Sequence, residues 1–343
     1  MLWDSLGGYR VIEKDQLQKI WFNIADYEDR FRPNTFFIGG RRIGKTFSTF
    51  SYMYDKQPFL YVRNTEVQID ECCGDFGNPF KKWNKITGHN IHLEKEKKHA
   101  VILDGAGEDE RVVGYAASCS NIGAIRGADL SDFKIGLFDE FIEKKPLQYD
   151  QARFYNDMYE SINSNRELEG EKAFTMILLS NSQKLANSIL AEKDLITPIE
   201  NMMKTGQKTW SRGDCFICLP ESEVSELKKE TAFYKGREGS KNYEEALNNK
   251  FANDSFFAIA KRPLKEYIGV CMIDGIYIYK HKSNGKYYAC FTQCLNVPTF
   301  SSKDNFSIFY RTYGRQFDIM AASGLLECCD FTCKSRLYDI LKI

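Results

Sequence analysis

The sequence has little of what marks membrane, secreted or strongly DNA-coating proteins. It contains no apolar run near the ~20 residues that span a bilayer, and its first residues, MLWDS, lack the charged-then-apolar pattern of a signal peptide. Its formal net charge is zero, which argues against a histone-like or tail-driven DNA binder. A local DNA-binding patch is still allowed, because counterion release depends on the residues at the contact. We therefore expect a cytosolic protein.

Zinc and redox motifs are also scarce, although the chain has eleven cysteines. Cys215-x-x-Cys218 is the only C-x-x-C motif, and no second such motif or histidine pair completes a zinc site. The residues around it, 214–219, have the pattern of a buried strand. We interpret the cysteines as small buried thiols in a reducing compartment.

The first part of the chain has an α/β pattern. Apolar, strand-like segments at 35–38, 58–62, 134–138 and 173–179 are separated by segments that suit helices. Strands that alternate with helices predict a parallel sheet with crossover connections. Residues 66–112 look polar and broken, apart from one apolar island. The total length of 343 residues is enough for two domains of ordinary size.

The pattern changes after about residue 195. Segments 266–273, 276–281 and 286–292 have strand character, and the turn sequences between them, Asp274-Gly275 and 283–285, favour hairpins. They predict a three-stranded antiparallel meander. We divide the chain into an N-terminal α/β domain at 1–197, a linker region at 198–227 and a C-terminal α+β domain at 228–343.

A phosphate-binding motif follows the first strand of the α/β part. The stretch GGRRIGKT fits G-x-x-x-x-G-K-[ST] in full. In such a loop the backbone wraps phosphate oxygens, and the N–H groups at the helix start point at the anion. Lys45 would reach the β- and γ-phosphates of ATP, and the Thr46 hydroxyl would bind Mg²⁺. The predicted nucleotide-binding residues are Gly39, Gly40, Arg41, Arg42, Ile43, Gly44, Lys45 and Thr46.

An acidic pair ends the strand at 134–138. In P-loop enzymes an aspartate at this place, here Asp139, holds the magnesium ion. A glutamate directly after it, here Glu140, can polarise the attacking water. An enzyme that transfers phosphate to another substrate has less need of such a base. The pair therefore favours an ATP hydrolase over a small-molecule kinase.

Three further residues are candidates for the same site. Asn181 lies at the end of the strand at 173–179, where it would sense the γ-phosphate and hold the catalytic glutamate, or would cap the next helix. Arg126 and Arg166 are candidates for an arginine supplied to a neighbouring subunit, which would neutralise charge in the transition state. A surface salt bridge is the ordinary alternative for each arginine.

These motifs resemble, in order and spacing, the DNA-packaging ATPases of phi29-like bacteriophages. The resemblance is clear over roughly residues 30–190 and is weaker but colinear to the C-terminus. The most specific parts are the blocks FDEFI and LSN. The resemblance rests on the P-loop, the strand 59–63, the block 136–142, the tripeptide 165–167 and the strand end 179–181.

The resemblance implies a motor that moves DNA. That family uses a homomeric ring, taken as a pentamer, at the portal of an empty capsid, and it pumps double-stranded DNA inward with ATP and Mg²⁺. The implied partners are therefore double-stranded DNA, the portal or connector of the procapsid and further copies of this chain, without a membrane. The implied location is the host cytoplasm, with transient residence on the portal vertex. Some members also use a structural RNA, and the sequence does not decide whether this chain does.

The resemblance also implies roles for single residues. Asp139 becomes the metal ligand together with Thr46, Glu140 the catalytic glutamate, and Asn181 the glutamate switch or sensor. Arg126 falls where the family has a trans-acting basic residue. Arg166 falls beside the family's arginine-finger position, where this chain has Ser164. The finger stays undecided between the two arginines, and Arg126 is favoured.

The C-terminal domain of that family resembles a ribonuclease-H fold that has lost its nuclease. A working nuclease needs clustered carboxylates for two metals, and the strand at 267–272 has no aspartate in its body. We therefore predict no cleavage. The alternative, a terminase large subunit with an active nuclease, requires Asp274, Asp304 or Asp330 to converge on a metal site. A P-loop metabolic kinase is a more distant alternative, and the second substrate pocket that it needs is not evident.

Overall fold

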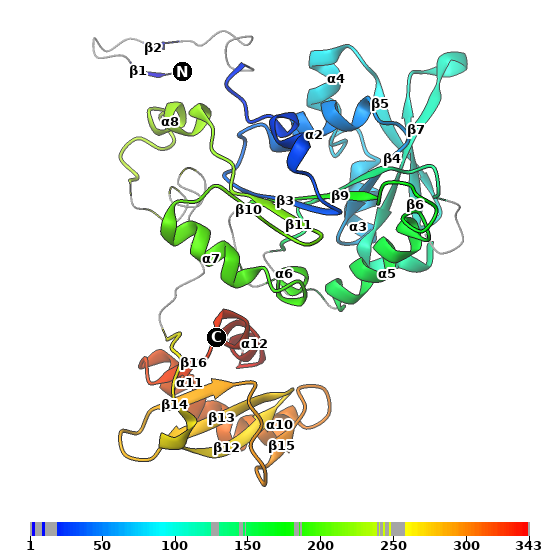
Figure 1. Ribbon diagram of the computed structural model, residues 1–343. Coiled ribbons are helices and arrows are strands. Elements are labelled where there is room, and N and C mark those ends of the chain that lie inside the picture. Colours follow the sequence, from blue (N-terminus) through cyan, green and yellow to red (C-terminus); the bar gives the residue numbers. More distant parts are fainter. Residues whose placement is uncertain are drawn as a thin grey trace. The chain divides into compact units, whose positions relative to one another are not determined.

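The computed structural model describes two compact units. They are divided by their internal contacts into Met1–Asn253 and Asp254–Ile343 (Figure 1). No described helix is long and apolar enough to cross a membrane. The described residues are 2–3, 9–10, 19–124, 130–143, 147, 149–181, 185, 187–238, 240, 243, 247 and 258–341.

A nine-stranded sheet organises the first unit. Its order is β10-β11-β3-β9-β8-β4-β7-β6-β5. The six strands from β11 to β7 are parallel, and β10, β6 and β5 extend the two ends in antiparallel fashion. This confirms the predicted α/β fold with a parallel sheet. The strands are β3 Asn34–Gly39, β4 Phe59–Arg63, β5 Ile91–Glu96, β6 His99–Asp104, β7 Arg111–Ser118, β8 Ile135–Asp139, β9 Thr175–Asn181, β10 Thr209–Arg212 and β11 Cys215–Cys218.

Helices cover both faces of this sheet. In the view of Figure 1, α2 lies above it and α5, α6 and α7 lie below it. A small separate pairing joins β1 (Leu2–Trp3) to β2 (Tyr9–Arg10). The helices of the first unit are α2 Lys45–Tyr54, α3 Glu66–Cys72, α4 Lys81–Thr87, α5 Gln151–Asn163, α6 Ser188–Glu192, α7 Ile196–Thr205 and α8 Glu223–Lys229, with 3₁₀ segments η1 Ile24–Arg30, η2 Gly107–Asp109 and η3 Cys119–Ala124.

The central strands are largely apolar because both of their faces are covered. Every residue of β3 and β8 is buried, as expected for strands inside a doubly covered parallel sheet. Phe37 and Leu137 pack into one core with Met53 of α2. On the other face, Phe138 stacks on Tyr155 of α5 with 6.3 Å between ring centroids. The two layers fix the ends of β3 and β8 relative to each other.

The predicted linker at 198–227 differs from the structure. Its middle forms β10 and β11, and β11 pairs in parallel with β3, so it belongs to the sheet of the first unit. Phe216 is fully buried there. The division between the units falls between Asn253 and Asp254 rather than at 228. Composition alone did not reveal this pairing, because the partner strand lies far away along the chain.

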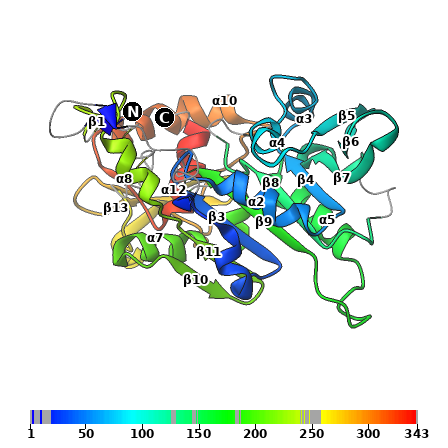
Figure 2. The ribbon, with the colours of Figure 1, turned by 90° about the horizontal axis from the view of Figure 1, so that it is seen from above.

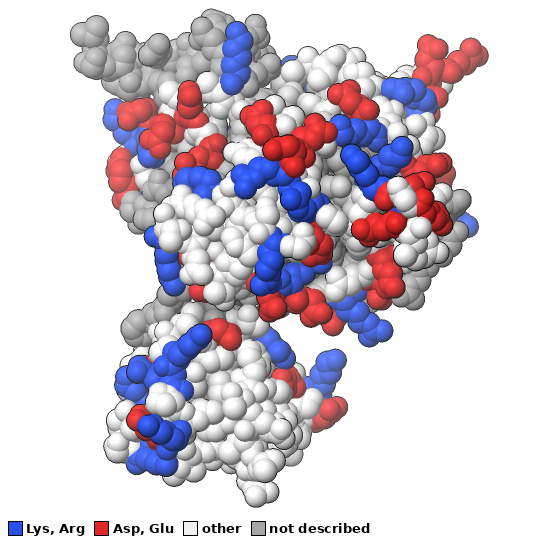
Figure 3. Space-filling model, viewed as in Figure 1, with Lys and Arg blue, Asp and Glu red and all other residues white. Residues whose placement is uncertain are grey.

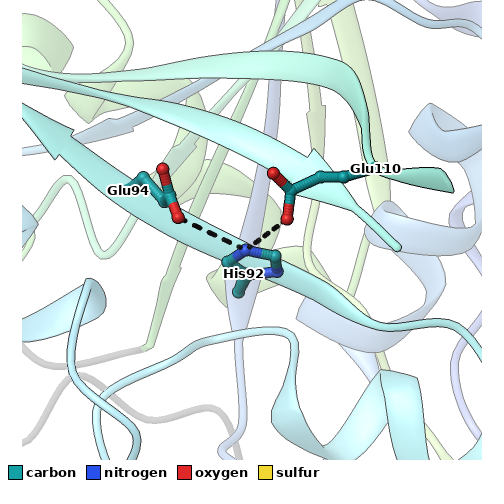
Figure 4. Close-up of side chains that lie close together, drawn as sticks. All are labelled: His92, Glu94 and Glu110. Carbon is teal, nitrogen blue, oxygen red and sulfur yellow. Dashed lines mark ion pairs between the residues drawn. The ribbon is translucent and has the colours of Figure 1, made fainter. Parts of the chain in front are cut away.

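The polar stretch at 66–112 is also more ordered than its sequence suggests. It forms α3, α4 and the antiparallel strands β5 and β6, which Figures 1 and 2 show at the end of the sheet opposite β10 and β11. Figure 4 shows His92 between two carboxylates at this end, with its Nε2 atom 3.3 Å from Glu110 Oε1 and 4.0 Å from Glu94 Oε1. Among the described residues this is the one group with metal-like spacing. Because Glu94 is 64% exposed, an ordinary surface ion pair explains it.

The second unit contains the predicted meander. Its sheet has the order β15-β12-β13-β14-β16, and β12, β13 and β14 are antiparallel neighbours. This confirms the three predicted strands, whereas the ribonuclease-H resemblance stays a prediction. Asp274 and Gly275 both have positive φ, 46° and 80°, as a two-residue hairpin turn requires. The elements are β12 Tyr267–Ile273, β13 Ile276–His281, β14 Tyr287–Cys290, β15 Thr299–Phe300, β16 Leu326–Cys328, α10 Phe306–Phe309, α11 Arg315–Ala322, α12 Phe331–Leu341, the 3₁₀ segment η4 Leu264–Glu266 and the π-helical segment η5 Tyr310–Gly314.

The aspartates that a nuclease would need have structural partners. Asp274 Oδ1 accepts a hydrogen bond from the Ser302 backbone N–H at 3.0 Å, and Asp330 Oδ1 accepts one from the Cys333 backbone N–H at 2.8 Å at the start of α12. Within the described residues, these two and Asp304 form no three-ligand group at metal-binding distance. The alternative of an active nuclease therefore gains no support from the fold.

The place of β11 in the sheet predicts a large effect at Phe216. Phe216→Ala should reduce the free energy of unfolding of the first unit by about 3–5 kcal/mol, because it leaves a cavity in a fully buried core. Denaturant unfolding followed by tryptophan fluorescence measures this, since all four tryptophans lie before residue 254. Leu168→Ala, at a residue that is 88% exposed, is the control and should change stability by no more than about 0.5 kcal/mol. An equally small effect at Phe216 would contradict its place in the core.

Candidate nucleotide-binding site

The P-loop connects the end of β3 to the start of α2, as predicted. Gly44 caps α2 with φ of 108°, and a Cβ atom there would lie 2.8 Å from the Cβ atom of Trp21. Only glycine suits both the left-handed backbone and this close approach. The Phe22 backbone N–H donates to the Ile43 carbonyl at 2.9 Å, and the Trp21 ring packs edge-on against Phe47. Residues just before η1 therefore support the loop from outside.

Lys45 points back into the loop that precedes it. Its Nζ atom donates to the Gly39 carbonyl at 3.0 Å and to the Gly40 carbonyl at 2.5 Å. The pKa of this lysine is lowered to about 7, chiefly by burial, while the negative charge of Asp139 opposes the shift and the positive charge of Lys228 adds to it. The ammonium group is thus desolvated, and among the described residues its hydrogen bonds go to neutral carbonyls. A phosphate group would supply an anionic partner.

Asp139 and Glu140 stand at the end of β8 in different surroundings. Asp139 is 7% exposed, and burial raises its pKa to about 6, with Arg63 opposing and Glu140 adding to the rise. The Glu140 side chain is 53% exposed and pairs with Arg63 at 2.8 Å between Oε2 and Nη2. Glu140 also has a positive φ of 54°, which turns its side chain away from the line of the strand. The buried acid suits a metal, and the exposed acid suits water.

A network of amide side chains that sequence analysis missed fixes this turn. Asn64 Nδ2 donates to the Glu140 carbonyl at 2.8 Å. Gln151 Nε2 donates to the Phe141 carbonyl at 2.6 Å and to Asn64 Oδ1 at 2.5 Å, and Asn187 Nδ2 donates to Gln151 Oε1 at 2.7 Å. These side chains satisfy the buried carbonyls that follow the strand. Their positions after β4 and at two helix starts were the only sequence signal.

Asn181 ends β9, the strand between β3 and β8. Its backbone lies opposite Gly39 of the loop, and it lines the same cavity as Lys45. Asn181 does not cap the next described helix, α6. The cap of that helix is Asn187, whose side chain accepts hydrogen bonds from the backbone N–H groups of Ile189 and Leu190. The position of Asn181 agrees with a sensor of the terminal phosphate, and that role stays a prediction.

A cavity of about 1120 Å³ brings these groups together. Thr46 and Asp139 both line it and offer the hydroxyl and carboxylate oxygens that Mg²⁺ prefers. Its carboxylates are Asp139, Glu140 and Glu143, and its cations are Arg41, Arg42, Lys45, Lys82 and Lys228. Since cations outnumber carboxylates, the cavity suits a polyanion. Both arginines of the loop, Arg41 and Arg42, thus line the cavity. The sequence alone did not decide whether they face the phosphates or the solvent.

The two candidate arginines have different outcomes. Arg126 lies outside the described residues, so its prediction stands as made. Arg166 is only 5% exposed; its Nη2 atom donates to the Ser131 carbonyl, and its Nη1 atom lies 3.7 Å from Glu171. It does not line the cavity. These contacts tie Arg166 into its own subunit, and to act on a neighbour it would have to leave them.

Cys215 and Cys218 form part of β11, as predicted. Both are buried free thiols, and burial raises the pKa of each to about 12. A high pKa disfavours the thiolate that metal binding and redox chemistry require. The structure thus agrees with the interpretation of these residues as core thiols.

Comparison with known proteins gives one consistent result. Residues 18–288 match the family model described as Podovirus DNA encapsidation protein (Gp16). The Phi-28 gp11 DNA packaging motor has a similar fold, with a TM-score of 0.60 and 18% identity over 94% of this chain and 98% of that chain. The bacteriophage Phi-29 viral genome packaging motor assembly gives a TM-score of 0.60 and 17% identity over 94% and 99%. A search of curated proteins found no match. The resemblance noted in the sequence is confirmed.

The buried state of Asp139 predicts how stability depends on pH. Because its folded pKa is raised from 3.8 to about 6, the native state binds the proton more tightly than the unfolded chain does. This contribution to stability is complete below about pH 4 and is lost as pH rises through about 6. Without Mg²⁺ or nucleotide, the stability of Asp139→Asn relative to the parent protein should therefore increase from pH 4 to pH 8, by about 3 kcal/mol at most.

Denaturant unfolding at both pH values measures this difference. Asp132→Asn removes an exposed carboxylate and is the control, which should change stability by no more than about 0.5 kcal/mol. An Asp139→Asn difference that does not change with pH would show that Asp139 is not desolvated.

Proposed function

The chain belongs to the podovirus DNA encapsidation protein (Gp16) family, and we propose that it hydrolyses ATP to drive double-stranded DNA into a procapsid. The observation that carries this proposal is the meeting of Lys45, Asp139 and Glu140 in one cavity. A loop lysine alone indicates phosphate binding. The half-exposed glutamate directly after a buried acid adds a base for water, which a motor needs and a kinase does not.

We propose a task for each group of the site. The N–H groups of the loop and Lys45 would hold the phosphates, and Thr46 and Asp139 would hold Mg²⁺, which neutralises phosphate charge as the bond to the leaving group breaks. Glu140 would orient the attacking water and accept its proton. Arg63 Nη2 lies 2.8 Å from Glu140 Oε2 and holds this carboxylate in an ion pair. Glu140 must leave this ion pair before it can act on water, and Asn181 at the neighbouring strand end is placed to respond to the terminal phosphate.

We propose that five copies of this chain form a homomeric ring on the portal of the procapsid. Arg126 is the proposed residue that completes the site of the next subunit, since Arg166 is bound within its own subunit. The side of the molecule in Figure 3 shows basic and acidic side chains interspersed over the first unit. With a formal net charge of zero, DNA contact would depend on a few local cations.

The proposal predicts ATPase activity that DNA or procapsids stimulate. Lys45→Ala and Glu140→Gln should each reduce the rate by about 100-fold or more, because they remove phosphate stabilisation and the base for water. Release of inorganic phosphate, with and without DNA, measures this. Lys85→Ala, at an exposed residue of α4, should leave the rate unchanged. Equal activity of the parent protein with and without DNA and procapsids would count against a packaging motor.

Subunit mixing tests the arginine supplied in trans. Arg126→Ala and Lys45→Ala should each be inactive alone. In an equal mixture, a subunit with an intact loop can sit beside one with an intact arginine, so about a quarter of the sites should recover if the arginine acts across the interface. Steady-state ATPase assays of the mixture, with native mass measurement to confirm rings, decide the result. No recovery in rings that contain both variants would place Arg126 outside a trans role.

A further inference from the structure

The P-loop carbonyls are held by two lysines rather than one. Lys45 binds the carbonyls of Gly39 and Gly40. The next two carbonyls, of Arg41 and Arg42, accept hydrogen bonds from Lys228 Nζ at 2.7 Å and 3.1 Å. Lys228 belongs to α8, far from the loop in the sequence, and no motif marks it. Four consecutive carbonyls of the loop thus face two ammonium groups.

The start of α8 is fixed beside the loop by independent contacts. The Ser222 hydroxyl donates to the Ile20 carbonyl at 2.8 Å and accepts from the Val224 backbone N–H at 3.2 Å. Pro220 lies so close to Gly39 that a Cβ atom on this glycine would be 2.9 Å from the proline ring. Lys228 is therefore held at the cavity by the fold of its own segment.

Lys228 differs from the adjacent lysine in its ion pairs. Within the described residues no ion pair is found for it, whereas the adjacent Lys229 pairs with Glu226 at 2.7 Å. Burial, together with the positive charges of Arg42 and Lys82, lowers the pKa of Lys228 to about 8. An ammonium group has three donors, and two are used on the loop. Lys228 therefore resembles Lys45 in its surroundings: desolvated, bound to loop carbonyls and directed into a cation-rich cavity.

We propose that Lys228 is a second phosphate-binding lysine of this site, which exchanges the carbonyls of Arg41 and Arg42 for phosphate oxygens of a nucleoside triphosphate. This inference rests on the proposed function, because it takes the cavity to be an ATP site. The exchange would draw α8 toward the phosphates. Nucleotide binding would then act directly on the segment that continues along the chain, through residues 230–253, to the second unit.

Three substitutions separate phosphate binding from mere support of the loop. Lys228→Gln keeps N–H donors for the loop carbonyls but removes the charge, and Lys228→Arg keeps the charge. Lys229→Gln is the matched control on the same helix. The probe is a non-hydrolysable ATP analogue with Mg²⁺, titrated by calorimetry against the full chain. A parallel thermal unfolding experiment checks that each variant is folded.

We expect Lys228→Gln to bind the analogue about tenfold or more weakly, the loss of one charge-assisted contact, and Lys228→Arg to retain affinity within about threefold. Lys229→Gln should bind as the parent protein does. Affinity of folded Lys228→Gln equal to that of the parent would overturn the role of Lys228 and leave the ATP site intact. Failure of the parent protein itself to bind the analogue would instead overturn the proposed function.

Discussion

The desolvation of two opposite charges is the constraint on which the site depends. Lys45 and Asp139 are both buried, and burial moves the pKa of the lysine down to about 7 and that of the aspartate up to about 6. Each group therefore loses much of its preference for the charged state near neutral pH. A magnesium-bound polyphosphate would give the lysine an anion, and its metal would add a second cation beside Asp139, whose Oδ2 atom already lies 3.7 Å from Arg63 Nη1. These two buried charges thus favour tight and selective binding of a charged ligand in the cavity.

The parallel sheet brings the residues of the site together. The loop, Arg63, Asp139 and Asn181 follow or end β3, β4, β8 and β9, whose carboxyl ends meet at one edge because these strands are parallel. Insertion of β9 between β3 and β8 leaves room for a ligand between the loop and the acidic pair. The amide network of Asn64 and Gln151 then fixes the turn after β8. Rigid strand ends position the reacting groups, and side-chain hydrogen bonds refine them.

The sequence predicted those parts of the site that short motifs define. The loop, Asp139 and Glu140 could be found because each follows an apolar strand within a few residues. Arg63, Gln151 and Lys228 could not, since tertiary packing brings them from distant segments and their residue types are common on surfaces. Likewise, β11 resembled a linker strand because its partner β3 is remote, and Arg166 resembled a free arginine because its burial depends on the 130–134 loop. Site residues that belong to short motifs can be predicted from the sequence, whereas residues that tertiary packing brings to the site cannot.

The position of β11 has a consequence for how the protein is made. Asn34 at the start of β3 donates a side-chain hydrogen bond to Asp214, 180 residues later in the chain, and β11 covers the outer side of β3. Contacts at such long sequence separation form slowly, because a large loop must close first. During synthesis β3, the strand that leads into the P-loop, leaves the ribosome early. It cannot pair with β11 until that strand has also been made. The nascent chain therefore has an exposed, apolar strand edge for most of its translation, a period in which chaperone binding would protect it from aggregation.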